Sequence, residues 1–416
     1  MPARDDVVVV GGGAVGLACA LALAGAGRSV RVLEARTVGS GSSHGNCGTL
    51  TPSHSAPLAA PGTVGKALRW MLVPDAPFYV APRVDPALWR WFAAFALRCN
   101  PRDWHAAMRA KAALLLDSRA VFPDWVARHA LDCEFVESGV DYVFRDPARL
   151  AAFRRELLPL AELGIAAEEI DADAVLAGEP ALKPGVAGAV RFPGDARLRP
   201  DRYVAGLARA ACAAGVAIDE HCEVLSIDGD APTVRVATSA GVRDARDVVV
   251  ATGAWSPALA RASGFRAPPI QPGKGYSITY SRPDPAPRRP MTLVERSVCV
   301  STWDSGFRLG STMEFSGYDS SLNRRRLDAL ERGAAEYLRV PTGPRKLEEW
   351  YGWRPLTTDD LPLLGAVPSR PGLWLATGHG MLGISMSTGS ADLLADLVCG
   401  RAPRIDPAPY RPERFA

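Results

Sequence analysis

Short unbroken apolar runs alternate with amphipathic stretches along this chain, and that alternation predicts an α/β fold. Valines fill residues 7–10, and a second apolar run covers 248–251. Runs of this kind are typical of parallel strands that are buried on both faces of a sheet. An alanine-rich helical stretch follows the first run as far as Gly27, and a second strand ends at Glu34. The opening therefore predicts a strand–helix–strand unit of the Rossmann type.

The middle of the chain predicts a second domain of the α+β class, inserted between parts of the first. Its expected strands are 139–144, 187–192, 273–280, 298–302 and 308–313. Its expected helices are 103–131, as one long helix or a helix pair, 147–163 and 324–339. We interpret Arg324-Arg325-Arg326 as the solvated start of the last helix. These strands predict a mostly antiparallel sheet.

The first pattern resumes after the insertion, so the Rossmann-type domain is discontinuous. Its later elements are a helix at 199–214, strands at 216–218, 224–227, 247–251 and 373–376, and a helix at 387–398. The expected division is 1–54, 195–265 and 350–416 for the nucleotide-binding domain. The second domain then comprises 55–194 and 266–349.

Three glycines follow the first strand with the spacing Gly11-x-Gly13-x-x-Gly16, in the strand–turn–helix context where that spacing predicts a dinucleotide site. Gly11 permits the tight turn, Gly13 permits backbone approach to a pyrophosphate, and Gly16 permits close packing of helix on strand. The phosphates would lie at the helix N-terminus. Glu34 stands where an acidic side chain accepts the adenosine ribose hydroxyls, which favours a neutral ribose over a phosphorylated one.

Two further glycine bends occur far along the chain. One is Ala251-Thr252-Gly253, and the other is the segment 377–384, which leads into the last helix. We interpret the three bends as the cradle of a single long cofactor. A helix N-terminus suits an atom that becomes negative, such as the N1–C2=O edge of a reduced flavin.

Composition and charge restrict the function classes. The chain has 416 residues, of which 48% are apolar and 22% charged, and its net charge of +3 creates no long-range field for nucleic acid. The eight cysteines are scattered without a Cys-x-x-Cys pair, and the six histidines do not fall at ligand spacing. We therefore expect a reduced chain without a metal. No signal peptide and no apolar run of about 20 residues is evident, so we expect a cytoplasmic location.

Two stretches leave alternatives open. Residues 38–52 are small and polar, typical either of a backbone cradle for a flat ring or of a flexible surface loop. Helices are expected at 66–72 and 88–97, and aromatic residues crowd the region from Trp70 to Phe95. We interpret these aromatics mainly as core. The alternative is a patch that contacts the inner face of a membrane or a partner protein, with a basic fringe at Lys66, Arg69 and Arg90.

Several motifs together carry a resemblance that spans nearly the full length. They are the turn at 11–16, Asn46-Cys47-Gly48, Ser55-Ala56-Pro57 with Ala60-Pro61-Gly62, Ala251-Thr252-Gly253, Lys274-Gly275-Tyr276-Ser277, Trp350 with Arg354-Pro355, Gly378-His379-Gly380 and Leu382-Gly383. With these motifs the chain resembles the flavin-dependent D-amino acid dehydrogenase (small subunit) family, within the D-amino acid oxidase and glycine/sarcosine oxidase superfamily.

The resemblance implies FAD bound in an extended form on the Rossmann-type domain. It places the pyrophosphate on Gly11, Gly13, Ala14, Val15 and Gly16, the adenosine ribose on Glu34, and the adenine near Val224. It places the isoalloxazine beside Asn46, Cys47, Gly48 and Thr49, with its pyrimidine edge at Gly380, Met381, Leu382, Gly383 and Ile384. Further implied cofactor contacts are Ala35, Ser43, His44, Thr252, Gly253 and Trp255.

The resemblance also implies catalytic residues. Arg354 matches the family arginine that holds the substrate carboxylate, a task that suits the guanidinium fork; a structural or surface arginine is the alternative. Tyr276 either closes over the substrate or is an ordinary strand aromatic. His44 is expected to tune the flavin, and His379 either does so or makes a structural hydrogen bond.

Four residues depart from the family pattern. His44 and Cys47 replace small residues, and Met381 and Ile384 replace threonine and tryptophan near the ring. These departures concern the substrate range more than the reaction type. A covalent flavin link through His44 or Cys47 is a minor alternative.

The implied reaction is oxidative deamination of a D-amino acid by hydride transfer from Cα to flavin N5, with D-proline or a hydroxy-D-proline as candidate substrates. The electron acceptor would be a quinone or an electron-transfer protein. The first alternative is an oxidase of glycine, sarcosine or another secondary amine that produces hydrogen peroxide. The others are a non-catalytic flavoprotein subunit and a nicotinamide dehydrogenase, which would leave the C-terminal glycine loop unexplained.

Overall fold

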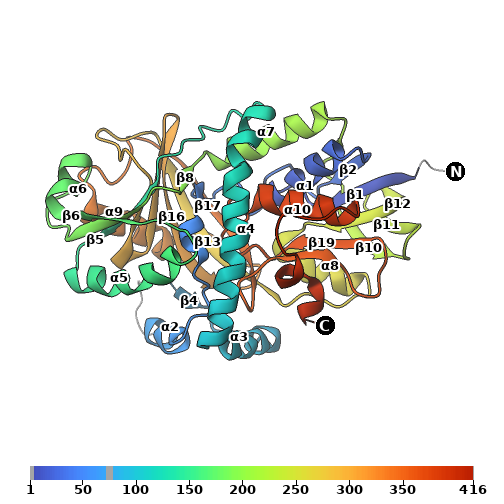
Figure 1. The fold of residues 1–416 in the computed structure, drawn as a ribbon, viewed down its shortest axis with the longest axis horizontal. Helices are drawn as coiled ribbons and strands as arrows, with labels where there is room; N and C mark the ends of the chain where they lie inside the picture. The colour runs from blue at the N-terminus through green and yellow to red at the C-terminus, as the bar shows by residue number, and fades with distance from the viewer. Residues whose placement is uncertain (1–3, 72–77, 416) are drawn as a thin grey trace.

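The computed structural model describes residues 4–71 and 78–415, which form two β-sheets side by side (Figure 1). The long helix α4 crosses in front of them. The first sheet contains β1 (Asp5–Val10), β2 (Val30–Leu33), β9 (Ala217–Asp219), β10 (Val224–Asp228), β11 (Val234–Thr238), β12 (Gly241–Val250), β18 (Leu363–Ala366) and β19 (Leu373–Thr377). Its order is β10-β11-β12-β1-β2-β9, and β19 also pairs with β12.

The centre of the first sheet is the parallel arrangement that the apolar runs predict. β1 lies between β2 and β12 and runs parallel to both. Its four consecutive valines are buried, because both faces of the sheet are covered. The consecutive strands β9 and β10 stand at opposite edges of this sheet, so they are not neighbours.

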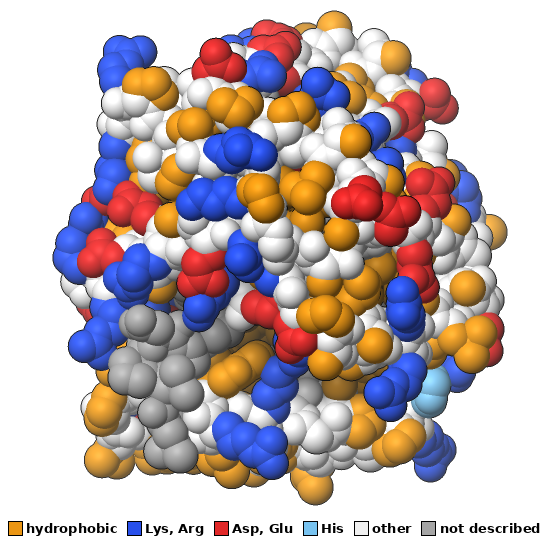
Figure 2. Space-filling view, turned by 90° about the vertical axis from the view of Figure 1, so that its left-hand side faces the viewer, with side chains coloured by type: hydrophobic (Ala, Val, Ile, Leu, Met, Phe, Trp, Pro, Cys, Tyr) orange, Lys and Arg blue, Asp and Glu red, His pale blue; other side chains and the backbone are white. Residues whose placement is uncertain are grey.

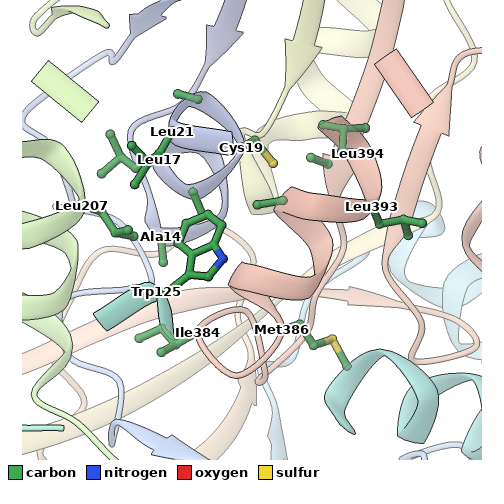
Figure 3. Close-up of a cluster of buried hydrophobic side chains, with 14 of the residues drawn as sticks. Ala14, Leu17, Cys19, Leu21, Trp125, Leu207, Ile384, Met386, Leu393 and Leu394 are labelled. Carbon is green, nitrogen blue, oxygen red and sulfur yellow. The ribbon is translucent and has the colours of Figure 1, made fainter. Parts of the chain in front are cut away.

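The helices of this part pack on the first sheet, and all of them except α8 share one core. They are α1 (Ala14–Gly25), α4 (Pro101–Arg128), α7 (Pro200–Ala213), α8 (Ser256–Ala262) and α10 (Ser387–Val398). Figure 3 shows Leu17, Trp125, Leu207, Ile384 and Leu393 in one buried cluster, contributed by α1, α4, α7, the loop before α10 and α10 itself. This core fixes the N-terminus of α1 and the loop before α10 relative to each other.

The second sheet is mostly antiparallel, as expected. Its order is β17 (Lys346–Thr357), β13 (Ile270–Tyr280), β16 (Gly306–Phe315), β15 (Val298–Trp303), β14 (Met291–Leu293), β5 (Val140–Phe144), β7 (Gly188–Phe192) and β6 (Glu168–Asp171). The strand β4 (Phe78–Val80) pairs with β16. The remaining α-helices and strands of the described residues are α2 (Thr63–Met71), α3 (Pro86–Arg98), α5 (Pro147–Ala161), α6 (Ala172–Gly178), α9 (Arg324–Tyr337), and the short pair β3 (Thr49–Leu50) and β8 (Ala196–Arg197).

The division into two domains stays a proposal, and two elements refine it. Strand β17 belongs to the second sheet along its whole length, so the expected boundary at residue 350 falls inside it. Instead of a helix pair over 103–131, the structure has the single helix α4, which ends at Arg128 and whose buried side chains join the core around α1 and α10. The helix expected at 66–72 is α2, and residue 72 lies outside the described residues.

The interpretation of the arginine triplet is wrong for one residue. Helix α9 begins at Arg324, and Arg324 and Arg325 are exposed. Arg326 is only 4% exposed, with its guanidinium 4.8 Å from the centre of the Tyr79 ring. The helix places its third residue toward the sheet, so a charge run in the sequence does not determine which side chains reach solvent.

Candidate active site

One cavity of about 1190 Å³ is lined by residues from both sheets. It is larger than the roughly 300–1,000 Å³ of ordinary small-molecule pockets. The cavity brings the three glycine bends and the predicted arginine together. The predicted residues in its wall are Gly11, Gly13, Ala14, Val15, Glu34, Ala35, Ser43, Asn46, Cys47, Thr49, Val224, Thr252, Gly253, Trp255, Tyr276, Arg354, Gly380, Met381, Leu382, Gly383 and Ile384. Gly16, His44 and Gly48 are not among the lining residues.

Two glycines of the first bend are required by the protein itself. Gly11 has φ +113°, and a Cβ there would lie 2.6 Å from the carbonyl oxygen of Ala251. A Cβ on Gly16 would lie 2.0 Å from the carbonyl oxygen of Gly11. Both distances are far below van der Waals contact, so α1 could not pack against β1 and β12 with any side chain at these positions.

Gly13 differs, because the space beside it belongs to the cavity. A Cβ on Gly13 would meet the Ser43 hydroxyl at 3.5 Å, an ordinary contact. Gly13 is also the N-cap of α1 and has no side chain that could cap the helix, and the first helical N–H, that of Ala14, donates to the Ser43 hydroxyl at 3.2 Å. Gly13, Ala14 and Val15 bring this helix end to the cavity wall, where the positive end of the helix dipole favours an anion. This arrangement fits the pyrophosphate of FAD.

Glu34 is held at the end of β2 with its carboxylate beside the glycine turn. Its two oxygens accept hydrogen bonds from the N–H of Gly12 at 2.7 Å and the N–H of Arg36 at 3.0 Å. Ala35 and Val224 line the same end of the cavity. These backbone bonds fix the carboxylate where the predicted ribose hydroxyls would meet it.

The small-residue loop 38–48 forms the middle of the wall and is tied to distant segments. The Ser42 hydroxyl donates to the carbonyl of Trp353, and the Asn46 side-chain amide donates to the carbonyl of Met381 at 3.4 Å. A Cβ on Gly45 would lie 2.0 Å from the Trp350 ring, so this loop can approach β17 only without a side chain there. The cradle interpretation of this loop is therefore the one the packing supports.

The C-terminal glycine loop, residues 377–384, lines the same cavity. Its Gly380 N–H donates to the carbonyl of Pro355 at 3.0 Å, and the Ser385 hydroxyl donates to the carbonyl of Thr49 at 3.0 Å. Gly378 and Gly380 have φ of +79° and +55°. The loop therefore reaches the cavity with its backbone, just before the first turn of α10.

Arg354 extends from β17 across the neighbouring strand β13. A Cβ on Gly275 would lie 2.3 Å from its guanidinium, so the glycine leaves room for the side chain to lie across that strand. One guanidinium nitrogen donates to the carbonyl of Thr312 at 2.5 Å, and another lies 3.5 Å from the carbonyl of Ser311. Ser311 and Thr312 have φ of 150° and 64°, and the pairing of β13 with β16 shifts register at this point. This irregularity aims two backbone carbonyls at the arginine.

The charge of Arg354 has no carboxylate partner among the described residues. Burial lowers the pKa of Arg354, while the nearby thiols of Cys47 and Cys299 act in the opposite direction. An arginine stays protonated in proteins even so. A partly buried cation that is fixed by neutral carbonyls and opens to a cavity is suited to an anionic ligand such as a carboxylate.

Tyr276, His44 and His379 each have one polar atom engaged by a protein partner. The Tyr276 hydroxyl donates to Glu314 at 3.2 Å, and its side chain reaches the cavity while only 1% exposed. The His44 ring nitrogen Nε2 lies 2.8 Å from Glu348. His379 Nε2 lies 3.0 Å from the Ser390 hydroxyl, and burial lowers the pKa of His379 to about 3. The structural hydrogen bond for His379 is the alternative that this geometry supports.

Sequence reasoning missed a buried polar group at the far end of the cavity. His54 and Tyr142 line it, with the Tyr142 hydroxyl 3.1 Å from Nδ1 of His54. Burial, together with the charge of Lys111, lowers the pKa of His54 to about 4, so this ring is neutral near pH 7. His54 stands between the motifs at 46–48 and 55–57, which is the signal that could have identified it.

Arg308 was also missed, and it positions the cradle rather than lining it. Its side chain is 1% exposed and donates to the carbonyls of His44 at 3.0 Å and Asn46 at 2.7 Å. Two charge-assisted hydrogen bonds thus fix the backbone of the loop just before Cys47. No motif marked this arginine, because its role depends on the register of β16.

Asp195 should make the stability of the protein depend on pH. It is 1% exposed and accepts two hydrogen bonds from Ser53, and burial raises the pKa of Asp195 from 3.8 to about 7. A raised native pKa contributes stability at low pH that is lost as pH rises through about 7. The wild type should therefore lose free energy of unfolding relative to the Asp195→Asn variant as the pH rises from about 4 to about 8, by at most about 4 kcal/mol. Urea titrations of both proteins across this range measure it; parallel pH profiles would contradict it.

The comparisons with known proteins agree with this geometry. The profile of the FAD-dependent oxidoreductase family, DAO, matches residues 6–397. A D-amino acid dehydrogenase of Cereibacter sphaeroides (strain ATCC 17029) is 35% identical over 98% of this chain and 95% of its own length. A D-amino acid dehydrogenase of Chromohalobacter salexigens is 33% identical over 99% of this chain and 100% of its own. The structure of glycine oxidase from Geobacillus kaustophilus superimposes with a TM-score of 0.80 and 25% identity, covering 98% of both chains.

The chain therefore belongs to the FAD-dependent oxidoreductase family. It is an FAD-dependent oxidoreductase, which confirms the fold class, the cofactor and the enzyme class that the sequence predicts. The individual cofactor contacts and catalytic roles stay predictions, and all but those of Gly16, His44 and Gly48 are supported by a common position in the cavity wall.

Proposed function

We propose that the protein oxidises the Cα–N bond of a D-amino acid and passes the electrons to an acceptor other than oxygen. The observation that carries this proposal is Arg354, a fixed guanidinium without a carboxylate partner among the described residues, in the wall of the cavity that the glycine bends also line. The relatives named D-amino acid dehydrogenase support the substrate class.

The chain's own residues supply binding and alignment. Arg354 holds the substrate carboxylate with two parallel hydrogen bonds, which fixes the position of Cα. Tyr276 closes one wall of the substrate space, and its engaged hydroxyl leaves the ring as the contacting surface. When bound, FAD supplies the hydride acceptor, and the first turns of α1 and α10 favour negative charge on it.

Anaerobic mixing with a panel of D- and L-amino acids, glycine and sarcosine tests the proposal directly. We expect the flavin absorbance of the purified holoenzyme to bleach with D-amino acids and not with their L-enantiomers. D-Proline and hydroxy-D-proline belong in the panel as the candidate cyclic substrates. A protein that bleaches only with L-amino acids, or with none of the panel, would overturn the proposal, and the second result would favour a non-catalytic subunit.

An oxidase is the second candidate function, because the structure of a glycine oxidase superimposes over nearly the whole chain. The two candidates differ in the electron acceptor. Turnover in air should yield little hydrogen peroxide per product if the protein is a dehydrogenase, and a soluble quinone analogue should raise the rate. A stoichiometric peroxide yield would establish the oxidase.

A surface around α2 and α3 is the place where we propose contact with a membrane. In the ranges 4–71 and 78–415, no helix combines the length and the apolar character that crossing a bilayer requires. The core interpretation of the aromatic region fits Trp91, which is 6% exposed, but Trp89 is 54% exposed. Val64, Leu68 and Met71 on α2 are also exposed, next to the basic residues Lys66, Arg69 and Arg90.

This arrangement suits an anionic lipid surface at the inner face of a membrane, where a quinone could accept the electrons. Figure 2 views the molecule from the left-hand side of Figure 1, where α2 and α3 lie at the bottom. Hydrophobic and basic side chains lie side by side along the lower part of this view. Apolar side chains insert between headgroups, while lysine and arginine pair with lipid phosphates. The cytoplasmic location expected from the sequence is compatible with such peripheral contact.

Vesicle co-sedimentation tests the membrane proposal. The wild-type protein should sediment with vesicles that contain anionic lipid, and the Leu68→Ser, Trp89→Ser double variant should remain in the supernatant. Val242→Ser is the matched control, because Val242 is 59% exposed and lies on β12 in the other sheet. Equal sedimentation of the double variant and wild type would eliminate this surface as the contact.

A further inference from the structure

Two cysteines from distant parts of the chain meet in the wall of the cavity. Cys47 belongs to the cradle loop and Cys299 to β15, and both line the cavity as free thiols. Each thiol shifts the pKa of the other through a side-chain hydrogen-bonding interaction. Cys299 pairs in register with Gly310 on β16, and a Cβ on Gly310 would lie 2.5 Å from the Cys47 sulfur. The glycine therefore makes the space that brings the Cys47 sulfur beside Cys299.

The surroundings make the two thiols chemically unequal. The hydrogen bond from Cys299 and the charges of Arg308 and Arg354 lower the pKa of Cys47, which outweighs burial. The same hydrogen bond and burial raise the pKa of Cys299 well above its usual value. One thiol is thus favoured as thiolate while its neighbour stays protonated. That is the arrangement of an attacking and a resolving cysteine.

Three other cysteines of the chain lack these features. Cys19 and Cys133 are buried in the core, and burial raises the pKa of each to about 12. Cys212 is exposed on α7 and is not among the residues that line the cavity. The pair at 47 and 299 is therefore a local property of the cavity wall and does not follow from cysteine content.

We propose that Cys47 and Cys299 form a redox-active dithiol in the wall of the active-site cavity, which a hydroperoxide oxidises to a disulfide. The Cys47 thiolate attacks one peroxide oxygen, so that an S–O bond forms, the O–O bond breaks, and the departing oxygen leaves as water after taking a proton. The Cys299 sulfur then attacks the Cys47 sulfur, forming the S–S bond. The sulfenic oxygen leaves with the Cys299 proton as a second water. Two thiols and one hydrogen peroxide give one disulfide and two waters.

The proposed disulfide would alter the substrate end of the cavity. Both sulfurs act electrostatically on Arg354, and oxidation removes the thiolate that faces its guanidinium. The inference does not require the proposed substrate class, because it concerns the two thiols alone.

Thiol mapping of the holoenzyme tests the dithiol. The protein is treated with hydrogen peroxide, alkylated with iodoacetamide, digested and analysed by mass spectrometry. We expect a peptide pair linked through Cys47 and Cys299, with loss of alkylation at both, and full recovery after dithiothreitol. Cys212→Ser is the matched control and should keep the linked pair. In Cys47→Ser, we expect Cys299 to remain fully alkylated under the same peroxide treatment.

The wild-type protein alone suffices to overturn the proposal, so the result does not depend on the folding of a variant. Full alkylation of Cys47 and Cys299 at peroxide concentrations that oxidise the exposed Cys212 would refute it. Separate oxidation of the two residues without a linked peptide would refute it equally.

Discussion

Replacing Arg354 with leucine should lower kcat/KM for the amino acid substrate by roughly 30-fold to several-thousand-fold. The reason is that truncating one partner of a buried, hydrogen-bonded charge pair costs about 2–5 kcal/mol. The loss should appear mainly in KM, because the guanidinium holds a carboxylate that keeps its charge throughout the reaction. Stopped-flow flavin reduction at varied substrate concentration separates binding from the chemical step.

The matched variant Arg354→Lys tests geometry against charge. Lysine keeps the positive charge but cannot supply the planar fork, and it leaves the carbonyls of Ser311 and Thr312 with fewer donors. We expect an affinity between those of the wild type and Arg354→Leu, with normal flavin content in both variants. An unchanged kcat/KM in Arg354→Leu would refute the assignment of the carboxylate site.

Replacing Gly13 with valine should give a folded protein that purifies without flavin. A Cβ added to Gly13 would point into the cavity, with the nearest protein atom at 3.5 Å. The valine methyl groups would therefore fill the space predicted for the pyrophosphate without clashing with the protein. Loss of a ligand held at 100 to 1,000 times its Kd removes about 2.7–4.1 kcal/mol of apparent stability. The visible spectrum and the thermal midpoint measure both effects.

Two other glycines serve as controls for this experiment. Gly25 lies at the far end of the same helix, and apart from its own stretch of helix no described residue comes within 4 Å of a Cβ added there, so Gly25→Val should leave the flavin content unchanged. Gly16→Ala should prevent folding, because its Cβ would lie 2.0 Å from the Gly11 carbonyl. A yellow Gly13→Val protein would show that the cofactor does not bind at this turn.

Features that depend on local backbone geometry could be predicted from the sequence. The valine run of β1 predicted a strand that is buried on both faces, and in the structure this strand lies between two parallel strands. Gly11 and Gly16 were predicted as conformational and packing requirements, and the close approaches at both positions agree. These predictions succeed because apolar periodicity and glycine placement act over a few residues.

Contacts that depend on strand register could not be predicted in this way. The two carbonyls that hold Arg354 depend on the irregularity at Ser311 and Thr312, some forty residues earlier in the chain. His44 was expected beside the flavin, and the structure places its ring against Glu348, outside the cavity lining. A one-residue change in pairing reverses which side of a sheet a side chain faces, and no local pattern records that pairing.

The sequence by itself determined the Rossmann-type core, the dinucleotide turn and the family, and it predicted the arginine that would hold a carboxylate. Only the tertiary structure decided how the proposed substrate end is built, from His54, Tyr142, the aim of Arg354 and the meeting of Cys47 with Cys299. The physical reason is distance along the chain. A turn or a buried strand is fixed by its own residues, whereas the substrate end is assembled from segments that the packing of two sheets brings together.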